Sequence, residues 1–304
     1  MNRIRVGSRE STLALWQTNW VIERLSRSNP GLQFEVVHIK TEGDKMPDAP
    51  LAKIGGRGVF VKELESALLD GRIDIAVHSL KDMPSLTPES LAIAAVTERE
   101  DARDVLVSRG KMPLSDLPFG AKVGTSSVRR AAQMKYLRPD VQILELRGNL
   151  ETRLRKAEGG DYDAVILAAA GIKRLGLEDR IAEHLPTEQF LPAVGQGALA
   201  VEIRADEGEI QSIVVPVTHR PTQLAVLAER SFLRVVGGGC SAPVAAYGRL
   251  EGNRLILDGM IASLDGQIMI KDRLEGEPAR AISLGEEMAG RLLERGGRDI
   301  LTNL

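Results

Sequence analysis

The order of apolar and polar residues in the first third of the chain predicts strands that alternate with helices. Short apolar, β-branched runs at residues 3–7, 34–40 and 73–77 are typical of strands. Ser11 can cap a helix that carries apolar residues at helical spacing, and a second helix is expected over 60–70. Strands separated by helices in this way usually pair in parallel, so this part should form an open α/β sheet.

The same alternation returns between residues 98 and 197. Strands are expected at 105–108, 121–124, 142–146 and 164–168, and helices at 127–137, 149–158 and 169–175. A further strand over 198–204 could rejoin the first sheet. The chain would then cross twice between two lobes, as in hinged two-lobe binding folds.

The pattern changes in the last third of the chain. Thr222 is expected to cap a helix that ends at Val236. Turn residues at Gly252-Asn253 and Asp265-Gly266 predict antiparallel hairpins, and a closing helix is expected over 279–295. This combination predicts a small α+β domain with an antiparallel sheet.

These patterns together predict an α/β fold with three domains. Lobe 1 comprises residues 1–97 and 198–216, and lobe 2 comprises residues 98–197. The C-terminal domain comprises residues 217–304.

The amino-acid composition argues against several classes of function. The only cysteine in 304 residues excludes an intrachain disulfide, and four scattered histidines do not favour a metal site. A net charge of −2 argues against a general nucleic-acid binder, and no apolar run is long enough to span a membrane. The N-terminal residues lack the apolar core of a signal peptide. We therefore expect a cytoplasmic protein that binds no nucleic acid, membrane or metal.

The lone cysteine, Cys240, follows three glycines and precedes a proline at position 243. A free cysteine is often a buried, inert side chain, and that reading stays open here. The glycines instead favour a loop that presents the thiol to a cleft, where it could serve as a covalent attachment site.

Basic and hydroxyl side chains recur just after predicted strands. Lys81 and Asp82 follow the strand at 73–77, where ligand sites of open α/β sheets lie. The alternative is a solvated turn with a surface ion pair. A second cluster starts the helix after the strand at 121–124 and could form an anion site. Its members are Thr125, Ser127, Arg129 and Arg130.

The alternative for this second cluster is an ordinary helix cap with surface arginines. Arg147 and Arg153 repeat the pattern after the strand at 142–146, and Arg9 does so after the first strand. Several such sites in a chain of net charge −2 suggest arginines that converge on one polyanion. The phosphate-binding glycine motifs of nucleotide enzymes are absent, so a small polycarboxylate is favoured. Residues 191–197 can be read as a hinge, a ligand contact or both.

At these motifs the chain resembles the porphobilinogen deaminase family, also called hydroxymethylbilane synthases. The matching stretches run in order over the whole chain: residues 8–17, 53–58, 74–84, 124–130, 146–149, 191–197 and 238–240. The resemblance implies two lobes like those of periplasmic binding proteins and a C-terminal domain. It also implies a transferase that adds porphobilinogen units, with loss of ammonia, to a cysteine-bound dipyrromethane cofactor and releases the linear tetrapyrrole hydroxymethylbilane.

The resemblance further assigns roles to individual residues. Cys240 corresponds to the cofactor anchor and Asp82 to the catalytic carboxylate. The residues expected to hold the acid groups of the cofactor are Lys81, Thr125, Ser127, Arg129 and Arg130. Those expected to hold substrate and the growing chain are Arg9, Arg147 and Arg153. We also expect a monomer that hands its product to the next enzyme of porphyrin and heme biosynthesis.

Two positions depart from the family pattern. Gly237 stands where relatives often have Glu, and Arg57 stands where many have Lys. A rival from another class is a non-catalytic solute-binding or sensor module of two-lobe architecture that recognises a polycarboxylate. It would need no thiol and no covalent adduct.

Overall fold

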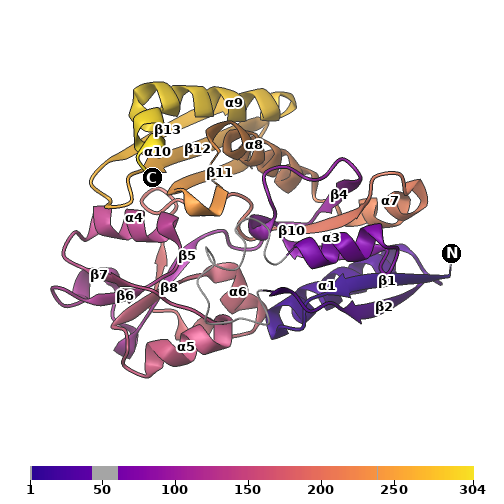
Figure 1. Ribbon diagram of the computed structural model, residues 1–304, viewed down its shortest axis with the longest axis horizontal. Helices are drawn as coiled ribbons and strands as arrows, with labels where there is room; N and C mark the ends of the chain where they lie inside the picture. Colours follow the sequence, from indigo (N-terminus) through magenta and orange to yellow (C-terminus); the bar gives the residue numbers. More distant parts are fainter. Residues whose placement is uncertain (1, 43–60, 238) are drawn as a thin grey trace. The chain divides into compact units, whose positions relative to one another are not determined.

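A computed structural model describes residues 2–42, 61–237 and 239–304 (Figure 1). At Cys240 it describes the backbone only. The glycine-rich stretch at 55–58, with Arg57, lies outside the described residues. The chain divides into two compact units, Met1–Glu100 with Ala198–Gln223 and Asp101–Gly197 with Leu224–Leu304. None of the described helices is long and apolar enough to cross a membrane.

The first unit contains a five-stranded mixed sheet in the order β2-β1-β3-β10-β4. Its elements are β1 (Arg3–Ser8), α1 (Thr12–Ser28), β2 (Gln33–His38), α3 (Lys62–Leu69), β3 (Ile75–Ser79), η1 (Leu80–Asp82), β4 (Leu91–Val96), β10 (Leu199–Arg204), α7 (Gly208–Val214) and η5 (Val215–Val217). The first three strands pair in parallel, as predicted. The expected return of the chain is confirmed, because β10 pairs antiparallel with β3 and β4.

Apolar spacing explains how α1 forms and packs. Ser11 caps the helix, and its Oγ accepts a hydrogen bond from the backbone N–H of Ala14 at 3.3 Å. Val21 and Leu25 lie on one face of α1 and are fully buried in a cluster with Ile4 and Ile75 of the sheet.

The second unit begins with another five-stranded mixed sheet, in the order β7-β6-β8-β5-β9. Its elements are β5 (Asp104–Ser108), η2 (Arg109–Lys111), η3 (Leu114–Asp116), β6 (Lys122–Gly124), α4 (Val128–Leu137), β7 (Gln142–Leu144), α5 (Leu150–Glu158), β8 (Ala164–Ala168), α6 (Ala169–Arg174), η4 (Glu178–Arg180) and β9 (Glu183–Leu185). β6 pairs in parallel with β7 and β8, whereas β5 runs antiparallel to β8 and β9.

The same unit ends with a three-stranded antiparallel sheet, β11-β12-β13, joined by the two predicted hairpins. The elements of this part are α8 (Arg220–Val236, which enters the second unit at Leu224), η6 (Gly239–Ser241), β11 (Val244–Glu251), β12 (Arg254–Ala262), β13 (Met269–Gly276), η7 (Pro278–Arg280), α9 (Ala281–Leu292), η8 (Leu293–Gly297) and α10 (Arg298–Thr302). The predicted fold class, two α/β lobes and a C-terminal α+β domain with an antiparallel sheet, is confirmed, and both α/β sheets contain antiparallel as well as parallel pairs.

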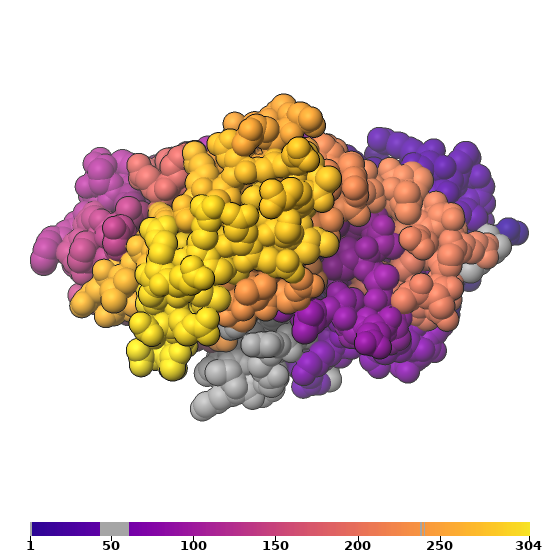
Figure 2. Space-filling view, turned by 90° about the horizontal axis from the view of Figure 1, so that it is seen from above, coloured from indigo at the N-terminus to yellow at the C-terminus, as the bar shows by residue number. Residues whose placement is uncertain are grey.

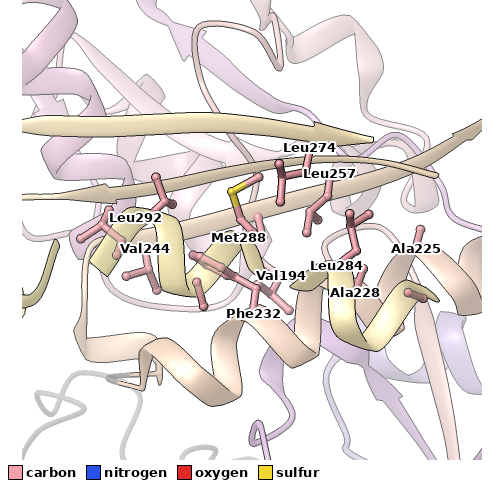
Figure 3. Close-up of a cluster of buried hydrophobic side chains, with 14 of the residues drawn as sticks. Val194, Ala225, Ala228, Phe232, Val244, Leu257, Leu274, Leu284, Met288 and Leu292 are labelled. Atoms are coloured by element: carbon pink, nitrogen blue, oxygen red, sulfur yellow. The ribbon is translucent and has the colours of Figure 1, made fainter. Parts of the chain in front are cut away.

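Helices α8 and α9 pack one face of this sheet around Phe232 and Met288, while the outer side of α9 is exposed (Figures 2 and 3). The two helices approach closely at Gly285. A Cβ added there would lie 2.1 Å from the backbone oxygen of Ala228, so only glycine fits.

Two features differ from the sequence expectations. α8 begins at Arg220 rather than after Thr222, because the Thr222 hydroxyl accepts a bond from the Arg99 backbone N–H at 3.1 Å instead of capping the helix. Pro221 is tolerated in the first turn, where its missing N–H has no helical partner. The short elements β4, β9 and α7 were not predicted.

Candidate active site

Asp82 lies on the one-turn helix η1, directly after β3. The flanking side chains Leu80 and Met83 are buried, and the Leu80 backbone N–H donates to the Ala198 carbonyl at 3.0 Å. The Asp82 carboxylate itself is exposed. The turn is therefore anchored by its apolar residues while its carboxylate stays accessible, which suits a group that exchanges protons with a ligand.

Two polar pairs support the end of β3 before this turn. His78 Nε2 lies 3.0 Å from Glu202 Oε2 on the adjacent strand β10, and both side chains are buried. Ser79 exchanges hydrogen bonds with Gln17 of α1 at 2.9 and 3.2 Å. The sequence analysis did not single out Glu202 or Gln17 as site residues. Glu202 could have been identified, because it is an isolated charge inside an apolar strand.

Arg9 lies at the same edge of this sheet as Asp82. β1 and β3 are parallel neighbours, so the residues that follow their carboxyl ends meet at one edge. Arg9 and Lys81 are both half-buried there. The first unit thus brings together two of the predicted basic residues and the predicted carboxylate.

The second unit gathers another set at the carboxyl ends of β6 and β7. Ser127 caps α4, and its Oγ accepts from the Arg130 backbone N–H at 3.4 Å. Thr125 is buried, and its Oγ1 accepts from the Ser127 backbone N–H at 3.1 Å. Because Gly124 and Leu144 are paired in register, this turn and the start of the following loop lie side by side.

Arg147 and Arg153 belong to that neighbouring loop and helix. Arg147 is half-buried and forms an ion pair with Glu145, with Nε 2.7 Å from Oε1. Arg153 Nε donates to the Gly148 carbonyl at 2.8 Å. Arg147 thus lies in the loop after β7, the strand paired with β6, and Arg153 lies in α5, which follows that loop.

Arg129 and Arg130 are buried, not exposed on the surface. The helix-cap reading of this stretch is thus right for Ser127 and wrong for the arginines. Both guanidinium groups form ion pairs with Asp104, a fully buried residue that was not predicted to matter. Burial alone would raise the pKa of Asp104, but the charges and hydrogen bonds of the two arginines hold this pKa far below its usual range.

The donor set of Arg129 fits an added carboxylate. Nη1 donates to Asp104 Oδ2 at 2.7 Å and to the Leu191 carbonyl at 2.6 Å. Among the described residues, no acceptor is bonded to its Nε or Nη2. That edge is the fork that binds carboxylates through two parallel hydrogen bonds, so a cofactor with acid side chains is chemically matched here.

Cys240 follows the end of α8. Gly237 takes the left-handed conformation, with φ of +76°, and its N–H donates to the Leu233 carbonyl at 2.9 Å. This is a glycine helix end, in which the positive φ favours glycine at position 237. The backbone of Cys240 then lies in the short helix η6, Gly239–Ser241.

Residues 191–197 are held within the second unit. The Leu191 N–H donates to Gln133 Oε1 at 2.7 Å, and the Gly195 N–H donates to Glu229 Oε2 at 2.7 Å. Glu229 is fully buried in α8, and its Oε1 also accepts from the Gly248 N–H at 2.8 Å. Glu229 was not expected from the sequence. Among the described residues, no cluster of histidine, cysteine, aspartate and glutamate could hold a metal ion.

Each unit thus carries polar and charged groups at the carboxyl ends of its parallel strands, where α/β proteins bind their ligands. Two sequence models of one family together match most of the chain. "Porphobilinogen deaminase, dipyromethane cofactor binding domain" covers residues 4–212, and "Porphobilinogen deaminase, C-terminal domain" covers residues 223–294. The chain belongs to the porphobilinogen deaminase family.

Full-length relatives agree with this assignment. Porphobilinogen deaminase of Geotalea uraniireducens is 50% identical over 100% of this chain and 95% of its own. That of Carboxydothermus hydrogenoformans is 51% identical over 98% of this chain and 96% of its own. Among solved structures, the BvgS periplasmic VFT2 domain of Bordetella pertussis covers 71% of this chain and 86% of its own, with 18% identity and a TM-score of 0.42.

Family membership makes this chain a transferase of tetrapyrrole biosynthesis. It joins four porphobilinogen units, with release of ammonia, to give the linear tetrapyrrole hydroxymethylbilane, and it uses a dipyrromethane cofactor.

Proposed function

We propose that Cys240 anchors the dipyrromethane cofactor through a thioether and that the reaction takes place on this primer. The observation that carries the proposal is a single thiol, placed after three glycines, in a chain that matches porphobilinogen deaminases over its whole length. When bound, the cofactor supplies the pyrrole carbon to which the first porphobilinogen unit is joined. A sulfur anchor keeps the growing chain from diffusing away between additions.

The basic and hydroxyl groups bind acid side chains. Those that hold the cofactor are Lys81, Thr125, Ser127, Arg129 and Arg130, and those that hold substrate and growing chain are Arg9, Arg147 and Arg153. These roles are supported by the position of the groups at the carboxyl ends of parallel strands. They are also supported by the forked Nε–Nη2 edge of Arg129, which binds no acceptor among the described residues. Several fixed donors on one polycarboxylate also explain how units are held in a reactive orientation.

Asp82 is the catalytic carboxylate. The amine of porphobilinogen must leave as ammonia, which places positive charge on the pyrrole, and a ring proton must be lost after the new bond forms. One carboxylate beside the pyrrole N–H can stabilise that charge and accept the proton. The support is the exposed carboxylate on an anchored turn, next to Lys81.

The protein acts as a cytoplasmic monomer and hands its product to the next enzyme of the pathway. Its working parts are lobe 1 (1–97 and 198–216), lobe 2 (98–197) and the C-terminal domain (217–304). This division is supported by the three separate sheets.

An acid-denatured mass spectrum tests the anchor. The parent protein should carry extra mass equal to two linked pyrrole units, whereas Cys240→Ser should be unmodified, folded and inactive. The serine oxygen is nearly isosteric with the thiol but is a poor nucleophile, so the fold should persist. An unmodified mass in fully active parent protein would remove the anchor, whereas an unmodified parent without activity would favour the two-lobe solute-binding module.

A further inference from the structure

Asp104, the first residue of β5, lies at the centre of a buried polar cluster in the second unit. Its Oδ1 accepts from Arg130 Nε at 3.0 Å, from Arg130 Nη2 at 2.7 Å and from Gln196 Nε2 at 3.0 Å. Its Oδ2 accepts from Arg129 Nη1 at 2.7 Å. Every side chain in this cluster is at least nine-tenths buried.

The cluster carries unbalanced charge. Within the described part of the chain, Asp104 is the only carboxylate that forms an ion pair with either Arg129 or Arg130. Two buried guanidinium cations therefore share one carboxylate. Since burial of an unpaired charge is costly, the arrangement favours the arrival of a further anion.

The two arginines use their hydrogen-bond donors differently. Arg130 uses its forked Nε–Nη2 edge on Asp104 and its Nη1 on the Ile166 carbonyl at 3.0 Å. Arg129 reaches Asp104 and Leu191 through Nη1 alone. The forked Nε–Nη2 edge of Arg130 thus binds Asp104. The forked edge of Arg129 has no acceptor among the described residues and can bind another one.

We propose that Asp104 is a positioning residue that orients Arg129 so that its forked edge is presented to a carboxylate of the cofactor. The inference rests on the proposed role of Arg129 in holding the cofactor. Asp104 touches neither cofactor nor substrate and acts through the guanidinium group. Gln196 joins residues 191–197 to the same carboxylate, so that segment helps to fix its position.

The competing explanation is a purely structural ion pair, and the first unit offers a matched control. Asp74 is also buried, and it is held by Arg5 Nε at 3.0 Å and Arg5 Nη2 at 2.6 Å, with Arg204 Nη2 at 3.5 Å. Here the forked Nε–Nη2 edge of Arg5 binds Asp74 itself. Asp74 precedes β3, at the end of the strand opposite Asp82.

The test compares full-length parent, Asp104→Asn and Asp74→Asn. Each protein is prepared without cofactor and incubated with porphobilinogen, and intact mass spectrometry follows the rate at which the two-pyrrole adduct appears per folded molecule. Both variants should lose thermal stability, because each removes a buried carboxylate that pairs with two arginines. Only Asp104→Asn should acquire the two-pyrrole adduct more slowly, by about tenfold or more. This factor is expected when one charged hydrogen-bonding contact is lost.

Loading of Asp104→Asn within about twofold of the parent, or equal slowing in Asp74→Asn, would show that Asp104 is only structural. If Asp104→Asn does not fold, Asp104→Glu keeps the charge but shifts it by one methylene. This variant should fold and load several-fold more slowly, and loading at the parent rate would overturn the proposal. Failure of the proposed function is recognised separately, because the parent itself would then acquire no adduct, and this inference would fall with it.

Discussion

Replacing Asp82 with Asn separates catalysis from folding. Among the described residues, no hydrogen bond or ion pair involves the Asp82 carboxylate, and the turn is anchored instead by Leu80 and Met83. An exposed substitution of this kind usually changes stability by less than about 0.5 kcal/mol. Loss of general acid–base assistance should slow each addition by about 10²–10⁴-fold, equivalent to about 3–5 kcal/mol of barrier.

The assay is single-turnover kinetics with porphobilinogen, in which intact mass spectrometry counts the units added at each time. Asp82→Glu keeps the charge and should elongate slowly, with intermediates accumulating on the enzyme. Asp116→Asn is the matched control, because Asp116 is also an exposed aspartate that ends a one-turn helix, η3. Elongation of Asp82→Asn at the parent rate would show that Asp82 is only a turn residue.

Three further predictions concern substrate binding, stability and pH. Arg147→Leu should stay folded but raise the Michaelis constant, because a hydrogen bond to a charged group contributes about 1.5–3 kcal/mol; steady-state kinetics with unchanged constants would exclude the role. Glu229→Gln should lower the free energy of unfolding by about 2–4 kcal/mol, since an amide can accept from only one of the two glycine N–H groups at 2.7 and 2.8 Å. An unchanged urea midpoint would contradict this. The stability lost in Asp104→Asn should be constant above about pH 5 and shrink below about pH 4, because there the unfolded chain takes up a proton at Asp104 that the native state, with its depressed pKa, does not bind. Urea unfolding at several pH values measures that difference.

Local patterns were sufficient to predict most of the fold. The parallel strands β1, β2 and β3, the capped helix α1 and both C-terminal hairpins were predicted because apolar spacing and turn residues act over a few positions. The short strands β4 and β9 were missed. Both lie at the edge of a sheet and are held by antiparallel pairing with distant strands, which no local pattern reports.

The candidate site was less predictable than the fold. Asp104 ends a stretch, 98–104, in which every residue except Ala102 is charged, a pattern typical of a solvated surface. Its burial depends on Arg129 and Arg130, which follow more than twenty positions later and meet it only in the folded chain. Glu202 was better indicated by the sequence, because it is an isolated carboxylate between Val201 and Ile203, whereas Glu229 is followed by Arg230 and resembles an ordinary charged position of a helix.

The central claim is that porphobilinogen units are joined on a primer that stays attached to Cys240. The most direct test supplies isotopically labelled porphobilinogen to purified enzyme that already carries unlabelled cofactor and follows many turnovers. Mass spectrometry then measures the label in released hydroxymethylbilane and in the peptide that contains Cys240. We predict that every ring of the product is labelled while the peptide keeps its unlabelled two-ring adduct. Unlabelled rings in the product, or a Cys240 peptide without an adduct in active enzyme, would contradict the account.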